Sequence, residues 1–137
     1  MRNIKVAMIG TGFMGRVHTE AIRRLGNVEV VAVADITAEL AGRFARQAGV
    51  PRSTGDYRTL LSDPEVEAVH VCTPNALHHP ISKAFMLAGK HVLCEKPLAV
   101  SAAEAKDLVE VAQTTGALNC LNHNLRYYPA VQHIRQM

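Results

Sequence analysis

Six short apolar runs alternate with stretches of helical periodicity along the chain. The runs cover residues 4–9, 28–34, 52–54, 68–72, 91–94 and 117–121, and the third is the weakest. Near-continuous apolarity is typical of strands buried on both faces, and strands that alternate with helices form parallel sheets. The pattern therefore predicts an α/β fold: a doubly wound, mostly parallel six-stranded sheet with helices on both faces, in three layers.

Capping residues mark the expected helix boundaries. The first helix follows a glycine-rich segment after residue 9, and the others cover about residues 37–49, 76–88 and 101–116, with a short one at 57–61 and a last one beginning near Pro129. Thr37 is a good N-cap residue, and Ser101 with Glu104 forms a capping box. The first helix is expected to bury one side made of Met14, Val17 and Ala21.

The glycine-rich segment at residues 10–15 is a G-x-G-x-x-G motif between the first predicted strand and the first predicted helix. Gly10 would form the tight turn, Gly12 would let the backbone approach a pyrophosphate, and Gly15 would let the helix pack on the strand. The helix N-terminus would receive the anion. The alternative is an ordinary strand–helix turn, but the strand–helix–strand context favours a Rossmann dinucleotide-binding fold.

Asp35 follows Gly15 by 20 residues, at the end of the second predicted strand. A carboxylate in this place accepts hydrogen bonds from both hydroxyls of an adenosine ribose, although it could also cap a helix. It would repel a 2′-phosphate, and Ile36 and Thr37 supply no cation. NAD is therefore expected as the cofactor and NADP is less favoured, with Arg16 left open as a reader of a 2′-phosphate.

Two further motifs follow the fourth and fifth predicted strands, at the edge where doubly wound sheets bind ligands. Residues 72–79 read Cys-Thr-Pro-Asn-Ala-Leu-His-His, and residues 94–97 read Cys-Glu-Lys-Pro. Residues 124–129 read Asn-Leu-Arg-Tyr-Tyr-Pro. With the glycine loop and Asp35, these motifs resemble the N-terminal cofactor domain of the glucose-fructose oxidoreductase/inositol dehydrogenase (Gfo/Idh/MocA) family. The resemblance covers essentially every residue, and the Glu95-Lys96-Pro97 triplet is its most specific part.

The resemblance implies a nicotinamide-dependent dehydrogenase or reductase that transfers a hydride to or from a sugar, a polyol or a related hydroxyl or keto compound. It makes Lys96 the catalytic residue, and an ammonium there could donate to the reacting oxygen or act as an acid–base group. Glu95 would hold the nicotinamide ribose, and a cis bond before Pro97 would aim Lys96 inward. The cofactor-binding residues expected in all are Gly10, Thr11, Gly12, Phe13, Met14, Gly15, Asp35, Ile36, Cys72, Thr73, Pro74, Asn75, His78, Glu95, Lys96, Asn124 and Arg126.

The chain also departs from this family, whose members are more than twice as long. We expect residues 1–123 to form the dinucleotide-binding domain and residues 124–137 to begin the connection to a second, substrate-binding domain absent from the chain. The Asp and His that complete the catalytic group in that domain are missing, so the chain is expected to be a fragment or a shortened relative. Cofactor binding is then better supported than turnover, and any homo-oligomer would belong to the full-length form. A dinucleotide-binding module without chemistry and a methyltransferase are the alternatives.

Composition excludes several other classes. The formal net charge is +3, but the basic residues are scattered, which argues against a nucleic-acid partner. The three cysteines form no Cys-x-x-Cys pair and the histidines have no metal-ligand spacing, so no metal is expected. His18 and His70 are interpreted as structural or exposed. The run at 4–9 is too short for a signal peptide or a membrane span, which favours a cytoplasmic location.

Overall fold

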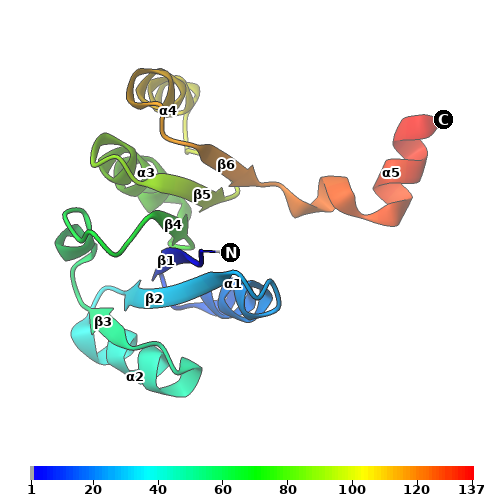
Figure 1. Cartoon of the computed structure of the whole chain (residues 1–137). Coiled ribbons are helices and arrows are strands. Elements are labelled where there is room, and N and C mark those ends of the chain that lie inside the picture. The colour runs from blue at the N-terminus through cyan, green and yellow to red at the C-terminus, as the bar shows by residue number, and fades with distance from the viewer. Residues whose placement is uncertain (1) are drawn as a thin grey trace.

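The computed structural model describes residues 2–137 and contains one six-stranded sheet. The strands are β1 (Ile4–Ile9), β2 (Val28–Ala34), β3 (Arg52–Thr54), β4 (Ala68–Val71), β5 (His91–Glu95) and β6 (Asn119–Asn122). All five pairings are parallel, in the order β3-β2-β1-β4-β5-β6 (Figure 1). The predicted doubly wound Rossmann fold is therefore confirmed.

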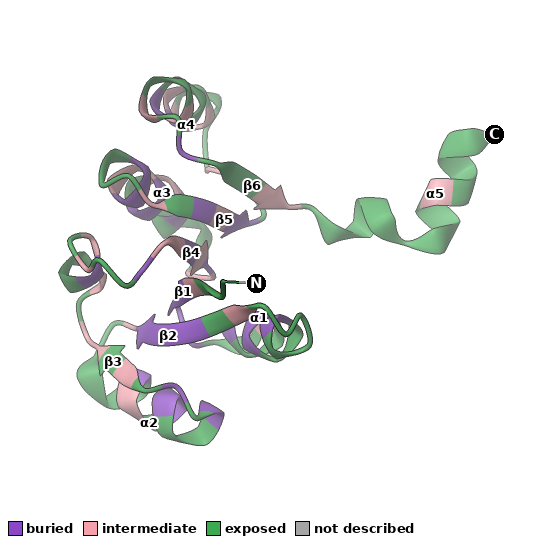
Figure 2. Cartoon of the chain, in the orientation of Figure 1, coloured by how far each residue is buried: buried purple, intermediate pink, exposed green. Residues whose placement is uncertain are grey.

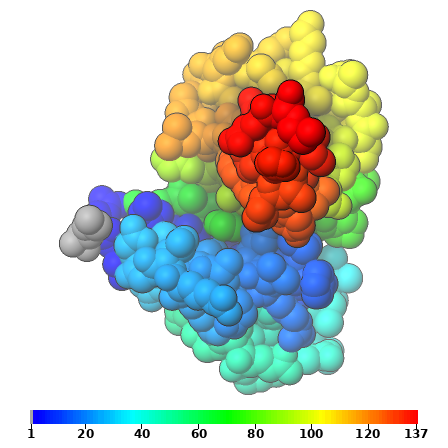
Figure 3. Space-filling model, turned by 90° about the vertical axis from the view of Figure 1, so that its right-hand side faces the viewer, coloured from blue at the N-terminus to red at the C-terminus, as the bar shows by residue number. Residues whose placement is uncertain are grey.

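The described residues also form five α-helices and three short 3₁₀ helices. The α-helices are α1 (Phe13–Arg23), α2 (Ala38–Ala48), α3 (His78–Leu87), α4 (Ala102–Thr115) and α5 (Pro129–Gln136), and the 3₁₀ helices are η1 (Tyr57–Leu60), η2 (Asn75–Leu77) and η3 (Asn124–Tyr127). The segment from η3 to α5 projects away from the sheet beyond β6 (Figure 1). Viewed from that side, these last residues stand nearest the viewer, in front of the rest of the molecule (Figure 3).

Two apolar cores lie on opposite faces of the sheet. On one face, Val6, Met8 and Val33 pack against α1 and α2, with Phe44 of α2 only 4% exposed. On the other face, strand residues such as Val71 pack against α3, α4 and η1. The buried residues concentrate in β1, β2 and the inner sides of the helices, whereas the segment after β6 is exposed apart from one partly buried position in α5 (Figure 2).

The buried face of α1 differs from the prediction. Met14 is only partly buried, and Val17 and Ala21 are exposed, whereas the buried residues are Gly15, His18, Thr19 and Ile22. The prediction was wrong because it followed the apolar residues alone. The close contact of Gly15 with the glycine loop sets the rotation of the helix, and this places two polar side chains inward. In α2, by contrast, the buried residues are the apolar ones, Ala41, Phe44, Ala45 and Ala48.

The capping residues act as expected in two helices. The Thr37 hydroxyl accepts from the Leu40 amide at 3.2 Å, and the Ser101 hydroxyl accepts from the Glu104 amide at 3.2 Å. The glycine at residue 116 ends α4 in the left-handed conformation, with φ +67°. Within the described residues, no helix is long and apolar enough to cross a membrane.

Candidate functional site

The parallel strands bring their carboxyl ends to one edge of the sheet, and the predicted motifs follow those ends. The backbone joins them directly: the Gly10 amide donates to the Ala34 carbonyl at 2.8 Å, and the Cys72 amide donates to the Ile9 carbonyl at 2.7 Å. The glycine loop after β1 therefore lies between the turn after β2 and the turn after β4. Segments as far apart in the sequence as Gly10 and Cys72 form one continuous edge.

The three glycines of the loop serve different needs. Gly10 has φ +93°, and a Cβ there would lie 2.6 Å from the Cys72 carbonyl oxygen. A Cβ on Gly15 would lie 2.2 Å from the Gly10 carbonyl oxygen. Neither position can hold a side chain without displacing backbone. Around Gly12, in contrast, a Cβ would meet nothing within 4 Å, so this glycine leaves open space beside the loop.

The N-terminus of α1 has no capping side chain. Its N-cap residue is Gly12, its first turn contains no acidic residue, and its first helical hydrogen bond runs from the Arg16 amide to the Gly12 carbonyl at 3.1 Å. The preceding amides of the first turn therefore have no helical acceptor. Because α1 begins directly at the glycine loop and has neither a side-chain cap nor an acidic first turn, its open N-terminus fits an anion such as a pyrophosphate.

Asp35 folds back onto the glycine loop. Its Oδ2 accepts from the Thr11 amide at 2.9 Å and from the Thr11 hydroxyl, and its Oδ1 accepts from the Ile36 amide at 2.7 Å. Burial tends to raise the pKa of Asp35, but the hydrogen bonds from Thr11 and Ile36 outweigh it and hold this pKa below its usual value. Asp35 is therefore a carboxylate at neutral pH. The Arg16 guanidinium lies 5.6 Å from the centre of the Phe44 ring.

The turn after β4 combines a buried hydroxyl with exposed residues. The Thr73 Oγ1 atom is buried and has no hydrogen-bond partner among residues 2–137, while Pro74 and Asn75 are exposed. Burial, together with the nearby Glu95 and Cys94, raises the pKa of the Cys72 thiol to about 12. This cysteine is therefore a neutral residue of the sheet edge at physiological pH. An orphaned buried hydroxyl next to an exposed turn fits an edge that receives a polar ligand.

His78 lies beneath the edge and is only 1% exposed. Its Nδ1 is 2.6 Å from the Pro97 carbonyl oxygen and its Nε2 is 2.9 Å from the Thr73 carbonyl oxygen. Both ring nitrogens thus contact backbone oxygens of the two turns. In this structure His78 ties the turn after β4 to the turn after β5, and the exposed face of the edge is formed by other residues.

The turn after β5 carries Glu95 and Lys96. The Lys96–Pro97 peptide bond is cis, as the sequence suggested. Lys96 is exposed. Glu95 is only 5% exposed, and its carboxylate turns beneath the sheet edge.

The partners of Glu95 were missed by sequence reasoning. His18 Nε2 lies 2.9 Å and Asn122 Nδ2 lies 2.5 Å from Glu95 Oε1, and His18 also contacts His70. A signal for His18 existed: it lies three residues after Gly15, on the helix face that the Gly15 contact must turn inward. The hydropathy pattern hid this signal, because a buried histidine looks like a surface residue until its partner is known.

Asn124 and Arg126 stand apart from the other predicted site residues. Both lie on the exposed η3, and the Arg126 backbone bonds to His123 and to the Gln132 side chain. The structure therefore places them beyond β6, away from the glycine loop. No cluster of three or more His, Cys, Asp or Glu side chains arranged to hold a metal ion occurs in the part of the chain that the structure describes.

Comparisons with known proteins agree with this geometry. The model of the Gfo/Idh/MocA family, described as an oxidoreductase family with an NAD-binding Rossmann fold, matches residues 4–123. The chain is 36% identical over 139 residues to a levoglucosan dehydrogenase of Pseudarthrobacter phenanthrenivorans, covering 96% of the chain and 36% of that protein. It is 32% identical to a mouse trans-1,2-dihydrobenzene-1,2-diol dehydrogenase, covering 98% of the chain and 41% of the relative.

Two solved structures are also similar. A levoglucosan dehydrogenase in complex with NADH and levoglucosan has a TM-score of 0.91 at 33% identity, with 98% of the chain and 40% of that structure covered. A biliverdin reductase from Synechocystis, in complex with biliverdin and NADP⁺, has a TM-score of 0.88 at 32% identity, with 97% and 42% covered. The chain thus spans roughly two-fifths of the length of these relatives.

Proposed function

Because the chain belongs to the Gfo/Idh/MocA oxidoreductase family, as an NAD(P)-binding Rossmann domain, we propose that its carboxyl edge binds the cofactor along the glycine loop and the turns after β2, β4 and β5. The observation that carries this proposal is the uncapped N-terminus of α1 beside the open space at Gly12. The free amides of this turn would hold the pyrophosphate, and Asp35 would hold the adenosine ribose. Thr73 would lie along the cofactor.

We propose NAD as the preferred cofactor, although the solved relatives include complexes with NADH and with NADP⁺. Asp35 is ionised, and a 2′-phosphate beside it would meet a like charge. The neighbouring Ile36 is 77% exposed and brings no positive charge to offset this repulsion. The Arg16 guanidinium, the other candidate, stacks on Phe44.

We further propose that the complete protein is a dehydrogenase or reductase acting on a sugar, a polyol or a related compound. The levoglucosan dehydrogenase relatives support this class of substrate. When bound, the nicotinamide supplies the hydride donor or acceptor. Lys96, exposed after β5, would donate to the reacting oxygen, and Glu95 would hold the nicotinamide ribose. Residues 124–137 would lead into a substrate domain, which would choose the substrate.

Calorimetric titration of the chain with NADH and NADPH tests the cofactor assignment. We expect wild type to bind NADH at least tenfold more tightly than NADPH, and Asp35→Ala to lose most of this preference. Glu110→Ala, an exposed substitution on α4, is the matched control and should behave like wild type. Equal affinity of wild type for both cofactors would contradict the assignment, and stronger binding of S-adenosylmethionine than of either would favour a methyltransferase.

Substitution of Lys96 separates an enzyme from a binding module. In the complete product of the gene, Lys96→Ala should reduce NADH oxidation with a keto-sugar by roughly a hundredfold or more, while NADH affinity changes little. Lys106→Ala, on the exposed side of α4, serves as the control for loss of an ordinary surface lysine. If wild type binds NADH but no substrate gives turnover, the non-catalytic module is the better description.

A further inference from the structure

Four polar side chains from four elements meet beneath the edge: His18 of α1, His70 of β4, Glu95 of β5 and Asn122 of β6. His18 Nδ1 lies 2.9 Å from His70 Nδ1, and its Nε2 lies 2.9 Å from Glu95 Oε1. His18 is 7% and Glu95 is 5% exposed. The rings of His18 and His70 meet edge to face, at an interplanar angle of 89°. A chain of contacts, buried at His18 and Glu95 and partly buried at His70, therefore runs from β4 through α1 to the carboxylate at the end of β5.

The donors and acceptors of this cluster fix the role of His18. Burial tends to raise the pKa of Glu95, but the hydrogen bonds from Asn122 and His18 outweigh it and hold this pKa below its usual value. Glu95 is therefore an ionised acceptor, and His18 Nε2 must donate to it. One proton then lies between the two Nδ1 atoms. Whichever ring carries that proton, His18 is held on both sides and its Nε2–H points at Glu95.

The other carboxylate oxygen of Glu95 faces the reactive turn. Glu95 Oε2 accepts from the backbone amide of Lys96 at 3.2 Å. Oε1 is thus occupied by His18 and Asn122, while Oε2 has one contact, to the residue that carries the proposed catalytic ammonium. A carboxylate oxygen can accept more than one hydrogen bond, so Oε2 keeps the capacity to accept from a ribose hydroxyl.

We propose that His18, braced by His70, is a positioning residue for Glu95: it holds Oε1 so that Oε2 stays available to the nicotinamide ribose and next to Lys96. This inference rests on the proposed function, because it gives Glu95 its contact with the cofactor. It reverses the interpretation of both histidines as merely structural or exposed. A purely structural network would stabilise the fold but would not distinguish one end of the cofactor from the other.

The test compares two ligands on this chain by calorimetry. NADH contains the nicotinamide ribose, and ADP contains only the adenosine half. His18→Leu replaces the imidazole donor by an apolar side chain. It should weaken NADH binding about tenfold and change ADP binding less than twofold. His18→Gln, which keeps an amide donor, should recover most of the NADH affinity. His133→Leu, on the exposed part of α5, should leave both affinities unchanged.

Three results separate the possible failures. If His18→Leu weakens ADP as much as NADH, or leaves both unchanged, the positioning role is wrong. If wild type binds ADP but gains nothing from the nicotinamide half, the contact of Glu95 with the ribose fails and the positioning role fails with it. If wild type binds neither ligand, the proposed function fails instead.

If the His18 variants do not fold, a measurement on the wild-type chain still tests the proposal. The imidazole ¹⁵N resonances should show His18 Nε2 protonated, and NADH should shift them whereas ADP should not. Equal shifts with both ligands, or an unprotonated Nε2, would overturn the proposal.

Discussion

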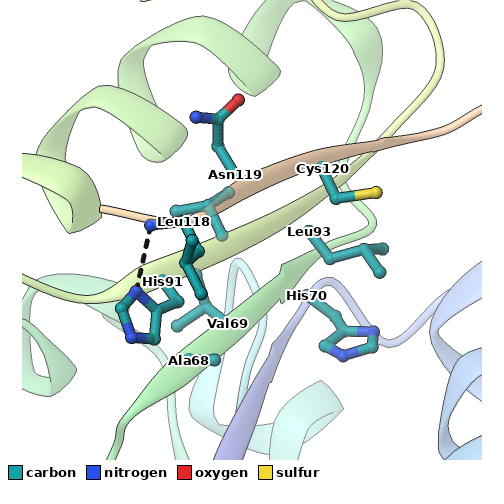
Figure 4. Close-up of a pocket in the computed structure, with 9 residues that line it drawn as sticks. Ala68, Val69, His70, His91, Leu93, Leu118, Asn119 and Cys120 are labelled. Carbon is teal, nitrogen blue, oxygen red and sulfur yellow. Dashed lines mark hydrogen bonds between the residues drawn. The ribbon is translucent and has the colours of Figure 1, made fainter. Parts of the chain in front are cut away.

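The face of the sheet that α1 and α2 pack against differs between the half formed by β1, β2 and β3 and the half formed by β4, β5 and β6. Around β1 and β2 this face is covered by α1 and α2, and strand residues beneath them such as Met8 and Val33 are fully buried. Across β4, β5 and β6 no helix of the described residues covers the same face, which forms a hollow of about 160 Å³ (Figure 4). Its lining residues are Ala68, Val69, His70, His91, Val92, Leu93, Leu118, Asn119 and Cys120.

The difference between the two halves is confined to this face, because the opposite face of β4 and β5 packs against α3 and α4 in an apolar core. In the first half, apolar side chains fill both faces of β1 and β2. In the second, the positions that point to the open face include His70 and Cys120, and His91 accepts a hydrogen bond from the Leu118 amide (Figure 4). His18 and Glu95 join the two halves from α1 to β5. We therefore expect substitutions of residues buried beneath α1 and α2 to reduce stability strongly, and substitutions of residues on the open part of this face to reduce it little.

The largest effect is expected in the loop that starts the first half. Gly15→Ala would place a Cβ 2.2 Å from the Gly10 carbonyl oxygen, against backbone that cannot move freely. We expect a loss of roughly 4 kcal/mol or more in the free energy of unfolding, measured by urea denaturation. Gly26→Ala, at φ +73° with open space around it, is the matched control and should cost only about 1 kcal/mol. Similar losses at the two positions would show that packing on the loop does not matter.

The next effect contrasts the covered and the open parts of the sheet face. Phe44→Ala removes a ring on the sheet-facing side of α2 that is only 4% exposed, and it should reduce the free energy of unfolding by about 3 to 4 kcal/mol. Leu118→Ala removes a side chain that is 72% exposed beside the hollow and should change it by less than about 0.5 kcal/mol. A large loss at Leu118 in chemical denaturation would mean that the open face is covered in solution.

His70, which contacts His18, should make the free energy of unfolding depend on pH. Burial, and then the nearby His18, lower the pKa of His70 to about 4 from an ordinary value of 6.5. The unfolded chain therefore binds the extra proton between pH 6.5 and 4, and the free energy of unfolding should fall by about 3 kcal/mol as the pH drops through that range. His70→Leu should remove most of this slope, and His133→Leu should not. Equal slopes in all three proteins would contradict the assignment.

The smallest effect separates binding from stability within one loop. Gly12→Ala meets nothing within 4 Å and has an ordinary backbone conformation, so the free energy of unfolding should stay within about 0.5 kcal/mol of wild type. The added methyl group would fill the space beside the free amides of α1, and NADH binding should weaken about tenfold. Unchanged NADH affinity in calorimetry would mean that the cofactor does not approach the loop at Gly12.

Much of the fold was predictable because local signals agreed with one another. The β-branched runs predicted all six strands, and three of them match to the residue: Ile4–Ile9, Val28–Ala34 and Arg52–Thr54. Thr37 and Ser101 cap their helices as expected. These features depend on residues close together in the sequence, so the sequence alone contains the information.

The rest depends on contacts between distant residues. The buried face of α1 was predicted wrongly because it depends on two distant contacts. Gly15 packs on Gly10, and His18 bonds to Glu95, which lies 77 residues further along the chain. The expected place of His78 near the cofactor stays a prediction. Both of its ring nitrogens contact backbone oxygens, of Thr73 and of Pro97, and no periodicity reveals such contacts. In the same way, apolar runs cannot show that one face of β5 and β6 has no helix over it.

Mapping of backbone amide shifts on addition of NADH tests the central claim most directly, because it reports on both halves at once. If the cofactor spans the edge, the amides of residues 10–15, 35, 73, 75, 95 and 96 should shift together, while those lining the hollow between β4 and β6 should not. Shifts confined to the hollow, or to the glycine loop alone, would contradict a dinucleotide bound across both halves of the sheet.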